Sequence, residues 1–233
     1  MDKLAVPASA ADLYLYRGAE VNACRPVMTG DVFVDVEIPG VDDGAGLALV
    51  LAHPCSMRQG AHVRDHVMMC RVLDGPKIPL AKWADSHYGA LPLPDLHATP
   101  SLGHRASFEL AGRVPTAQLG LDKRIACLDE RGIALLLQRL VCSYTRATIE
   151  PEVIHESVAP NLLEAELLEG WVEARTDGAG LPPDAAAIHA AEAEFDAVMS
   201  EVDPATGGTH RDRLRDPASW ASVRRLLAKR LAP

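Results

Sequence analysis

The side chains best suited to chemistry lie in one short stretch, residues 52–58, which reads Ala-His-Pro-Cys-Ser-Met-Arg. It brings together His53, Cys55 and Arg58, and a thiol beside an imidazole and a guanidinium ionises readily and can act as a nucleophile or redox thiol. A structural interpretation stays open: Cys55 as a small apolar residue at a strand end and His53 as a hydrogen-bonded turn residue. His53, Cys55 and Arg58 are the candidate catalytic residues.

Histidines are concentrated in the first half of the chain, where six of the nine lie between residues 53 and 104, and such a concentration can indicate a metal site. The four-residue spacing of His62, His66 and Cys70 would align ligands on a helix. This segment has the pattern of a strand, however, on which His66 and Cys70 share a face while His62 lies a loop away. The spacing matches no standard zinc motif, so the sequence predicts no metal and no cofactor.

Phosphate binding would use arginine and lysine side chains, and acid-base catalysis could also use a second histidine and a tyrosine. The obvious cations for a phosphate in the first half are Arg25, Arg58, Arg64, Arg71 and Lys82, and scattered surface positions are their simpler interpretation. The neighbours His87 and Tyr88 have side chains that can transfer protons. A His-Tyr pair in a loop does not by itself predict an activity.

The elements that position these residues are mostly short strands. Residues 29–40 alternate apolar and acidic side chains and end at Pro39-Gly40, which predicts a half-buried strand. A turn is expected at residues 54–60, and further strands at residues 47–52, 65–73, 78–83, 91–96 and 105–114. Short strands joined by turns, without crossover helices, predict a small antiparallel barrel or sandwich.

After Gly120 the pattern becomes helical. Asp129 is a suitable N-cap for a first helix, and apolar residues recur at three- and four-residue steps in three more, at residues 160–175, 184–202 and from Pro217 onward. A Gly- and Pro-rich break is expected at residues 177–183. The sequence therefore predicts an α+β protein, with a β-barrel domain at residues 1–120 and an all-helical C-terminal region at residues 121–233.

Charge is segregated within the helical region. The chain has a net charge of −9, which opposes binding to a phosphate backbone. Residues 150–203 hold 14 acidic side chains and one basic, and residues 209–233 hold seven basic and two acidic. We expect these segments to neutralise each other within the molecule or across a dimer. The apolar helix faces also need covering. A protein partner or second copy is therefore expected through helices 160–231, with nucleic acid not favoured.

Features of the whole chain indicate its setting. The longest apolar stretch, residues 46–52, is far shorter than the roughly 20 residues of a membrane span, and no cationic segment precedes an apolar core at the N-terminus. The five cysteines are irregularly spaced and include no Cys-x-x-Cys pair, a pattern typical of reduced thiols. We expect a cytoplasmic protein without a membrane association.

The order of three strands resembles the PemK/MazF toxin family. The chain has Gly30-Asp31-Val32 opening an alternating strand, then Leu-Ala-Leu-Val-Leu-Ala at residues 47–52 and Val-Met-Met-Cys-Arg-Val at residues 67–72. The resemblance covers residues 29–73. It implies a small SH3-like barrel and a bacterial toxin-antitoxin setting, in which such barrels cleave single-stranded RNA and are held by an antitoxin segment.

Two departures separate this chain from the catalytic pattern that the resemblance implies. The loop at residues 41–46 is acidic where family members carry an arginine or lysine, and Leu73-Asp74-Gly75 stands where a serine or threonine would follow the third strand. We therefore expect a non-catalytic interaction module for a protein or nucleic-acid partner. The alternative is an enzyme that uses the turn after the second strand, either a single-stranded-RNA endoribonuclease or a Cys/His hydrolase.

Overall fold

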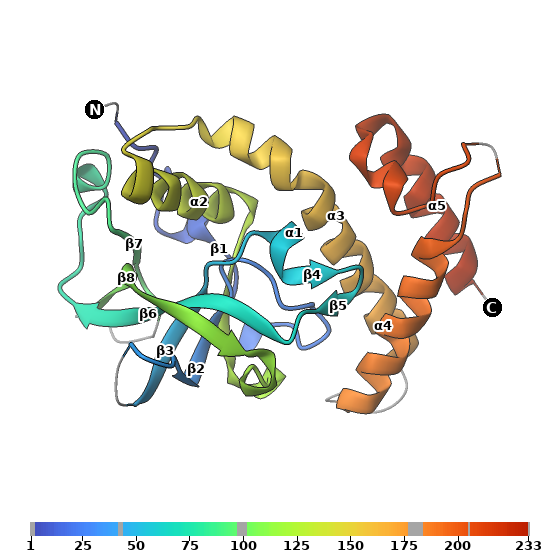
Figure 1. Cartoon of the computed structure of the whole chain (residues 1–233), viewed down its shortest axis with the longest axis horizontal. Coiled ribbons are helices and arrows are strands. Elements are labelled where there is room, and N and C mark those ends of the chain that lie inside the picture. The colour runs from blue at the N-terminus through green and yellow to red at the C-terminus, as the bar shows by residue number, and fades with distance from the viewer. Residues whose placement is uncertain (1–2, 42–43, 97–101, 177–183, 205, 233) are drawn as a thin grey trace. The chain divides into compact units, whose positions relative to one another are not determined.

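The protein has an α+β fold, with a seven-stranded antiparallel sheet and C-terminal helices (Figure 1). The structure is a computed structural model that describes residues 3–41, 44–96, 102–176, 184–204 and 206–232. The sheet consists of β1 (Tyr14–Arg17), β2 (Val32–Glu37), β3 (Ala45–Val50), β6 (His66–Gly75), β7 (Ala90–Leu93), β8 (Gly103–Pro115) and β9 (Arg124–Leu128). The α-helices are α1 (Pro54–Met57), α2 (Glu130–Thr145), α3 (Pro151–Thr176), α4 (Ala185–Ser200) and α5 (Trp220–Leu231).

The chain divides into two compact units. The first contains Met1–Val21, Met28–Met57 and Arg64–Val158, and thus the seven-stranded sheet, α1, α2 and the start of α3. The second contains Asn22–Val27, Arg58–Val63 and Ala159–Pro233. It holds the rest of α3, then α4 and α5, and a two-stranded hairpin of β4 (Arg58–Gln59) and β5 (His62–Val63).

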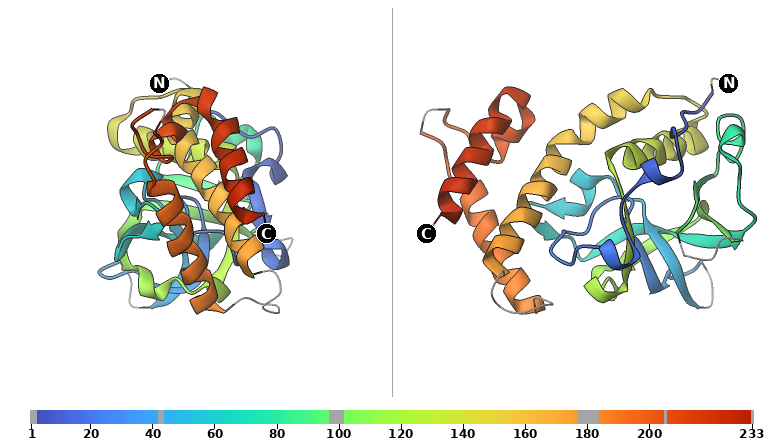
Figure 2. Two further views of the ribbon diagram at one scale, coloured as in Figure 1. Left: turned by 90° about the vertical axis from the view of Figure 1, so that its right-hand side faces the viewer. Right: turned by 180° about the vertical axis from the view of Figure 1, so that it is seen from behind.

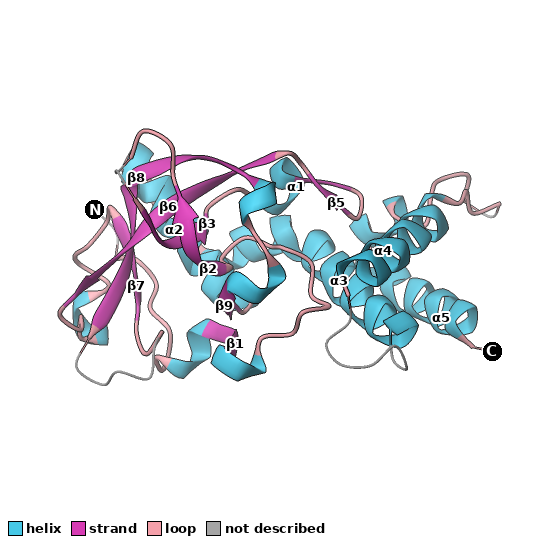
Figure 3. Cartoon of the chain, turned by 90° about the horizontal axis from the view of Figure 1, so that it is seen from below, coloured by secondary structure: helices cyan, strands magenta, loops and turns pink. Residues whose placement is uncertain are grey.

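The sheet of the first unit is open at its two edges. The strands follow the order β1-β9-β2-β3-β6-β8-β7, with every pair antiparallel. Figure 3 draws these strands as magenta arrows. Among the described residues, no backbone pairing joins β1 to β7. Side chains do reach across: Tyr14 donates a hydrogen bond to the carbonyl of Pro94 and Arg17 to that of Asp95, each at 2.8 Å. The antiparallel sheet is thus as expected, whereas its closure into a barrel is not shown.

The structure explains why a glycine and an aspartate, Gly30 and Asp31, stand just before β2. Gly30 has a φ of +85°, and a Cβ at this position would lie 2.8 Å from the side chain of Leu128, so only glycine fits. The carboxylate of Asp31 accepts hydrogen bonds from the backbone of Met28 and from the guanidinium of Arg124, each at 3.0 Å. Gly30 and Asp31 therefore anchor the start of β2 in the core.

Two parts of the first unit differ from expectation. Residues 78–83 form no strand: a 3₁₀ helix (Leu80–Lys82) follows Pro79, and the indole of Trp83 donates to the carbonyl of Ile78 at 3.0 Å. Trp83 is buried at the end of this turn, an arrangement that a strand pattern does not anticipate. The region after Gly120 is also not purely helical, because β9 pairs with both β1 and β2. The strand β1 was likewise unpredicted.

The helices agree better with their patterns. Asp129 caps α2 by accepting a hydrogen bond from the backbone of Gly132, and Asp184 caps α4 in the same way through Ala187. Helix α3 begins earlier than expected and contains Pro160, while Pro217 starts a 3₁₀ turn (Pro217–Ser219) that leads into α5. The break expected at residues 177–183 lies outside the described residues. No helix in the described part of the chain is long and apolar enough to cross a membrane.

Candidate functional site

The structure brings two of the three candidate catalytic residues together. His53 follows β3 and precedes the single turn of α1, on which Cys55 lies. The Nδ1 atom of His53 is 2.9 Å from the Sγ atom of Cys55. Cys55 is exposed, whereas the other four cysteines are buried. The chain therefore presents one accessible thiol, and it contacts an imidazole.

The hydrogen bonds of His53 indicate its protonation state. Burial lowers the pKa of His53, so the imidazole is neutral near pH 7. The backbone N–H of Cys55 also points to Nδ1, at 3.4 Å, which makes Nδ1 an acceptor. The thiol then donates to the same nitrogen, so the imidazole is placed to remove the thiol proton. Within the described residues no carboxylate bonds to His53, so the pair lacks the orienting acid of a catalytic triad.

Arg58 belongs to the second unit, and its contacts there are with the backbone. Its guanidinium donates to the carbonyl of Val27 at 3.1 Å and to the carbonyl of Ala61. These bonds fasten the β4–β5 hairpin to the segment that contains Val27. The position of Arg58 is thus explained by the local structure of the second unit.

Two more of the cations that the sequence offered for a phosphate are buried and have internal partners, so they are not scattered surface positions. Arg25 forms a buried ion pair with Glu169 at 3.1 Å in the second unit. Arg71 donates to the carbonyls of Val36 and Gly44, each at 2.9 Å, in the first unit. The remaining two cations, Arg64 and Lys82, are exposed.

In the part of the chain that the structure describes, the candidate metal ligands His62, His66 and Cys70 do not form a ligand set. Among the described residues, no group of three or more His, Cys, Asp or Glu side chains is arranged to hold a metal ion. His66 and Cys70 both lie on β6, but only His66 is exposed. Burial raises the pKa of Cys70, so this thiol stays protonated in the core.

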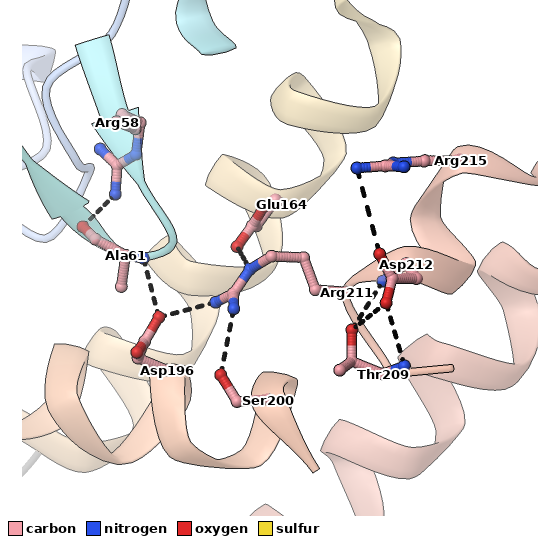
Figure 4. Close-up of polar contacts among 9 residues, drawn as sticks. All are labelled: Arg58, Ala61, Glu164, Asp196, Ser200, Thr209, Arg211, Asp212 and Arg215. Atoms are coloured by element: carbon pink, nitrogen blue, oxygen red, sulfur yellow. Dashed lines mark hydrogen bonds and ion pairs between the residues drawn. The ribbon is translucent and has the colours of Figure 1, made fainter. Parts of the chain in front are cut away.

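One polar network of the second unit centres on Arg211 (Figure 4). Its guanidinium donates to Glu164 of α3 at 2.8 Å and to Asp196 of α4 at 2.7 Å. It also reaches the hydroxyl of Ser200 at 3.2 Å. The same Asp196 oxygen accepts a hydrogen bond from the backbone of Ala61 at 3.1 Å. One arginine of the basic segment thus joins two acidic helices, and its partner Asp196 also holds the β4–β5 hairpin.

Further ion pairs repeat this relationship between the two charged segments. They are Arg213 with Asp203, Arg224 with Glu166 and Arg230 with Glu201. Together with Arg211, four of the seven basic residues of 209–233 pair with carboxylates in the described part of residues 150–203. This confirms the prediction that the segments associate, and it shows that they do so within one chain.

The apolar helix faces of the second unit are also covered within the chain. Trp171 of α3 and Phe195 of α4 are fully buried and meet edge to face, with ring centroids 6.0 Å apart. Val223 and Leu227 of α5 are also buried. Figure 2 shows α3, α4 and α5 from two further sides. The apolar faces of these helices are therefore buried by other parts of the same chain.

The sequence patterns did not identify Arg139 as a buried cation. Arg139 lies on α2, and its side chain is fully buried. It follows Leu136 by three residues and so falls on the apolar face of the predicted helix. An arginine at an apolar position of a helical pattern was the signal that could have identified it.

Comparison with known proteins does not assign this chain. No protein-family model matches it, and no curated protein matches it either.

Proposed function

We propose that this protein is a non-catalytic interaction module, PemK/MazF-like in its β-rich part, which binds a protein partner or a second copy through helices 160–231. The observation that carries the proposal is the use of Arg58, the only cation of the candidate catalytic set. It bonds to the backbone carbonyls of Val27 and Ala61, as a residue that stabilises a hairpin does. Catalysis on a phosphate would require a cation directed at the scissile group.

The charge pairing of the second unit favours a protein partner over a nucleic acid. A nucleic-acid-binding tail needs basic side chains that can exchange counterions for phosphates. Arg211, Arg213, Arg224 and Arg230 instead bind carboxylates of the same chain. Replacing these partners with phosphates would cost the intramolecular ion pairs.

A surface for a partner helix is available on α4. Four alanines recur on its exposed side at intervals of three and four residues, namely Ala186, Ala190, Ala193 and Ala197. Small side chains lose almost no conformational entropy on burial and allow two helices to approach closely. The docking face of the proposed module is this side of α4.

Self-association tests the second-copy form of this proposal directly. Light scattering coupled to size-exclusion chromatography across a concentration series should show a dimer, which Ala193→Arg dissociates because the large cation blocks close approach. The matched control Ala147→Arg, at an exposed position of the first unit, should leave the dimer intact. The docking face would be refuted if the protein were monomeric at every concentration and if no other protein bound it in a way that Ala193→Arg abolishes.

The non-catalytic part of the proposal has its own test. Incubation of the protein with single-stranded RNA, with and without divalent metal ions, should produce no cleavage. Cleavage without metal that is abolished by Arg58→Ala would establish the endoribonuclease instead.

A second function, thiol chemistry at Cys55, is favoured by the 2.9 Å contact between His53 and Cys55. If the imidazole activates the thiol, iodoacetamide at pH 7 should alkylate the wild type faster than His53→Gln. The control His66→Gln alters an exposed histidine of β6 and should not change the rate. Equal rates in all three proteins would leave Cys55 with the structural interpretation.

A further inference from the structure

The backbone on both sides of His53 and Cys55 holds the two residues in place. Before them, the amide of Ala52 donates to the carbonyl of Met68 on β6 at 3.2 Å. After them, the amide of the buried Met57 donates to the carbonyl of His53 at 3.2 Å. Cys55 itself is exposed. The 2.9 Å contact between Nδ1 of His53 and Sγ of Cys55 is therefore built into the folded first unit at an accessible position.

The amide of Cys55 indicates which reactions this pair can carry out. Attack of a thiolate on an ester or an amide creates an oxyanion, which needs N–H donors directed at it. The backbone N–H of Cys55 is directed instead at Nδ1 of His53, at 3.4 Å. Attack on a disulfide creates no oxyanion, because the negative charge passes to the sulfur that leaves. The geometry therefore fits a disulfide better than an acyl substrate.

The imidazole can serve both halves of such an exchange. Burial lowers the pKa of His53, so Nδ1 is unprotonated near pH 7 and can accept the thiol proton. The imidazolium that results has a proton to give to the departing sulfur. No carboxylate of the described residues bonds to His53, so no negative charge holds that proton on the ring. His53 is thus placed to take a proton from one sulfur and return it to another.

The other thiols of the chain are not placed to complete a dithiol cycle. Four cysteines are buried and free, namely Cys24, Cys70, Cys127 and Cys142. Burial also raises the pKa of Cys70, which keeps its thiol protonated. A dithiol oxidoreductase needs a second accessible cysteine to displace the group bound to the first. A group transferred to Cys55 therefore stays there until an external thiol removes it.

We propose that Cys55 is a site of reversible S-thiolation, which takes its group from a low-molecular-weight disulfide with His53 as the proton carrier. This inference rests on the thiol chemistry proposed above and names its substrate class. The Sγ–H proton moves to Nδ1 of His53, Sγ forms a bond to one sulfur of the disulfide RSSR, and the S–S bond of RSSR breaks. The departing sulfur takes the proton from Nδ1, so the products are the mixed disulfide of Cys55 and one free thiol RSH. Cys55 is oxidised, and the sulfur that leaves is reduced.

Reaction of the full chain with two neutral disulfides at pH 7, followed by intact mass spectrometry, tests this assignment. Bis(2-hydroxyethyl) disulfide releases a basic thiolate that gains from protonation, whereas 2,2′-dipyridyl disulfide releases a stable thione that does not. His53→Gln should slow the first exchange about tenfold and the second by a smaller factor, because only the first uses both proton transfers. His189→Gln, which alters an exposed histidine of α4, is the matched control and should react as the wild type does. The wild type should gain one group, and Cys55→Ser should gain none.

Equal slowing of both exchanges in His53→Gln would overturn the S-thiolation proposal, because His53 would then act on the thiol alone, while the thiol chemistry at Cys55 would stand. No slowing of either exchange, together with unchanged alkylation by iodoacetamide, would remove both. Release of the bound group with formation of an internal disulfide would also overturn the proposal. The wild type decides the matter even if the variant fails to fold. It should discriminate between the two disulfides less than N-acetylcysteine does, and equal discrimination would contradict a proton carried by His53.

Discussion

The guanidinium of Arg211 and the carboxylate of Asp196 meet at 2.7 Å, and this pair connects the basic C-terminal segment to α4 (Figure 4). Since Glu164 binds the same guanidinium, removing Arg211 would leave two carboxylates facing each other.

Arg211→Ala should therefore destabilise the second unit. The side chain is 27% exposed, so the loss should be smaller than for a fully buried pair, about 2 kcal/mol of unfolding free energy. Urea denaturation followed by circular dichroism measures it. Arg215→Ala is the control, because Arg215 is 83% exposed and its nearest carboxylate lies 4.0 Å away. Equal losses in both variants would contradict the bridging role of Arg211.

Gly60→Ala should be costly for two reasons. Gly60 has a φ of +63°, and a Cβ there would overlap the carboxylate of Asp196. The backbone strain alone is worth about 1 kcal/mol, as Gly40→Ala should show, because Gly40 has a φ of +76° and open space around it. The overlap should raise the loss in Gly60→Ala to about 3 kcal/mol. Thermal unfolding of both variants gives the comparison, and in an Asp196→Ala background the excess loss should shrink.

Asp31→Asn should destabilise the first unit by about 3 kcal/mol, because it removes the negative charge that faces a buried guanidinium. The side chains of Asp31 and Arg124 are 1% and 0% exposed, and their atoms meet at 3.0 Å. Asp35→Asn is the control: Asp35 is exposed at a φ of +53°, a conformation that asparagine also adopts readily. Denaturant midpoints that move equally in both would argue against a role for the Asp31–Arg124 pair.

The ion pair of Glu166 with Arg224 predicts a dependence on pH. The hydrogen bond from Arg224 lowers the pKa of Glu166 below its usual 4.5, so the ionised form is favoured in the folded state. This contribution is complete above pH 4.5 and is lost as the pH falls through the lowered pKa. Both side chains are about half exposed, so it amounts to about 0.5 kcal/mol.

Urea midpoints of wild type and Glu166→Gln should thus differ at pH 7 and converge at low pH. Glu156→Gln, at an exposed position early in α3, should match the wild type at both values. A difference that persists undiminished in acid would show that Glu166 acts through packing instead of charge.

Local patterns in the sequence by themselves determined the helices and several strands. The three- and four-residue steps of α2 and α4, with Asp129 and Asp184 as caps, depend on residues less than two turns apart. The contact of His53 with Cys55 was equally predictable, because only one residue separates them. The segregation of charge also predicted that residues 150–203 and 209–233 would form ion pairs with each other.

Only the tertiary structure decided which distant groups meet. The short strands β1 and β9 stabilise each other across more than a hundred residues, and neither has a pattern strong enough to be recognised alone. Arg58 looked like part of a site with its neighbours, yet it bonds to Val27, far back in the chain. Arg139 likewise reaches the backbone carbonyl of His87 only because α2 packs against β7. Hydrogen bonds and ion pairs between distant segments follow from the fold, and local periodicity carries no information about them.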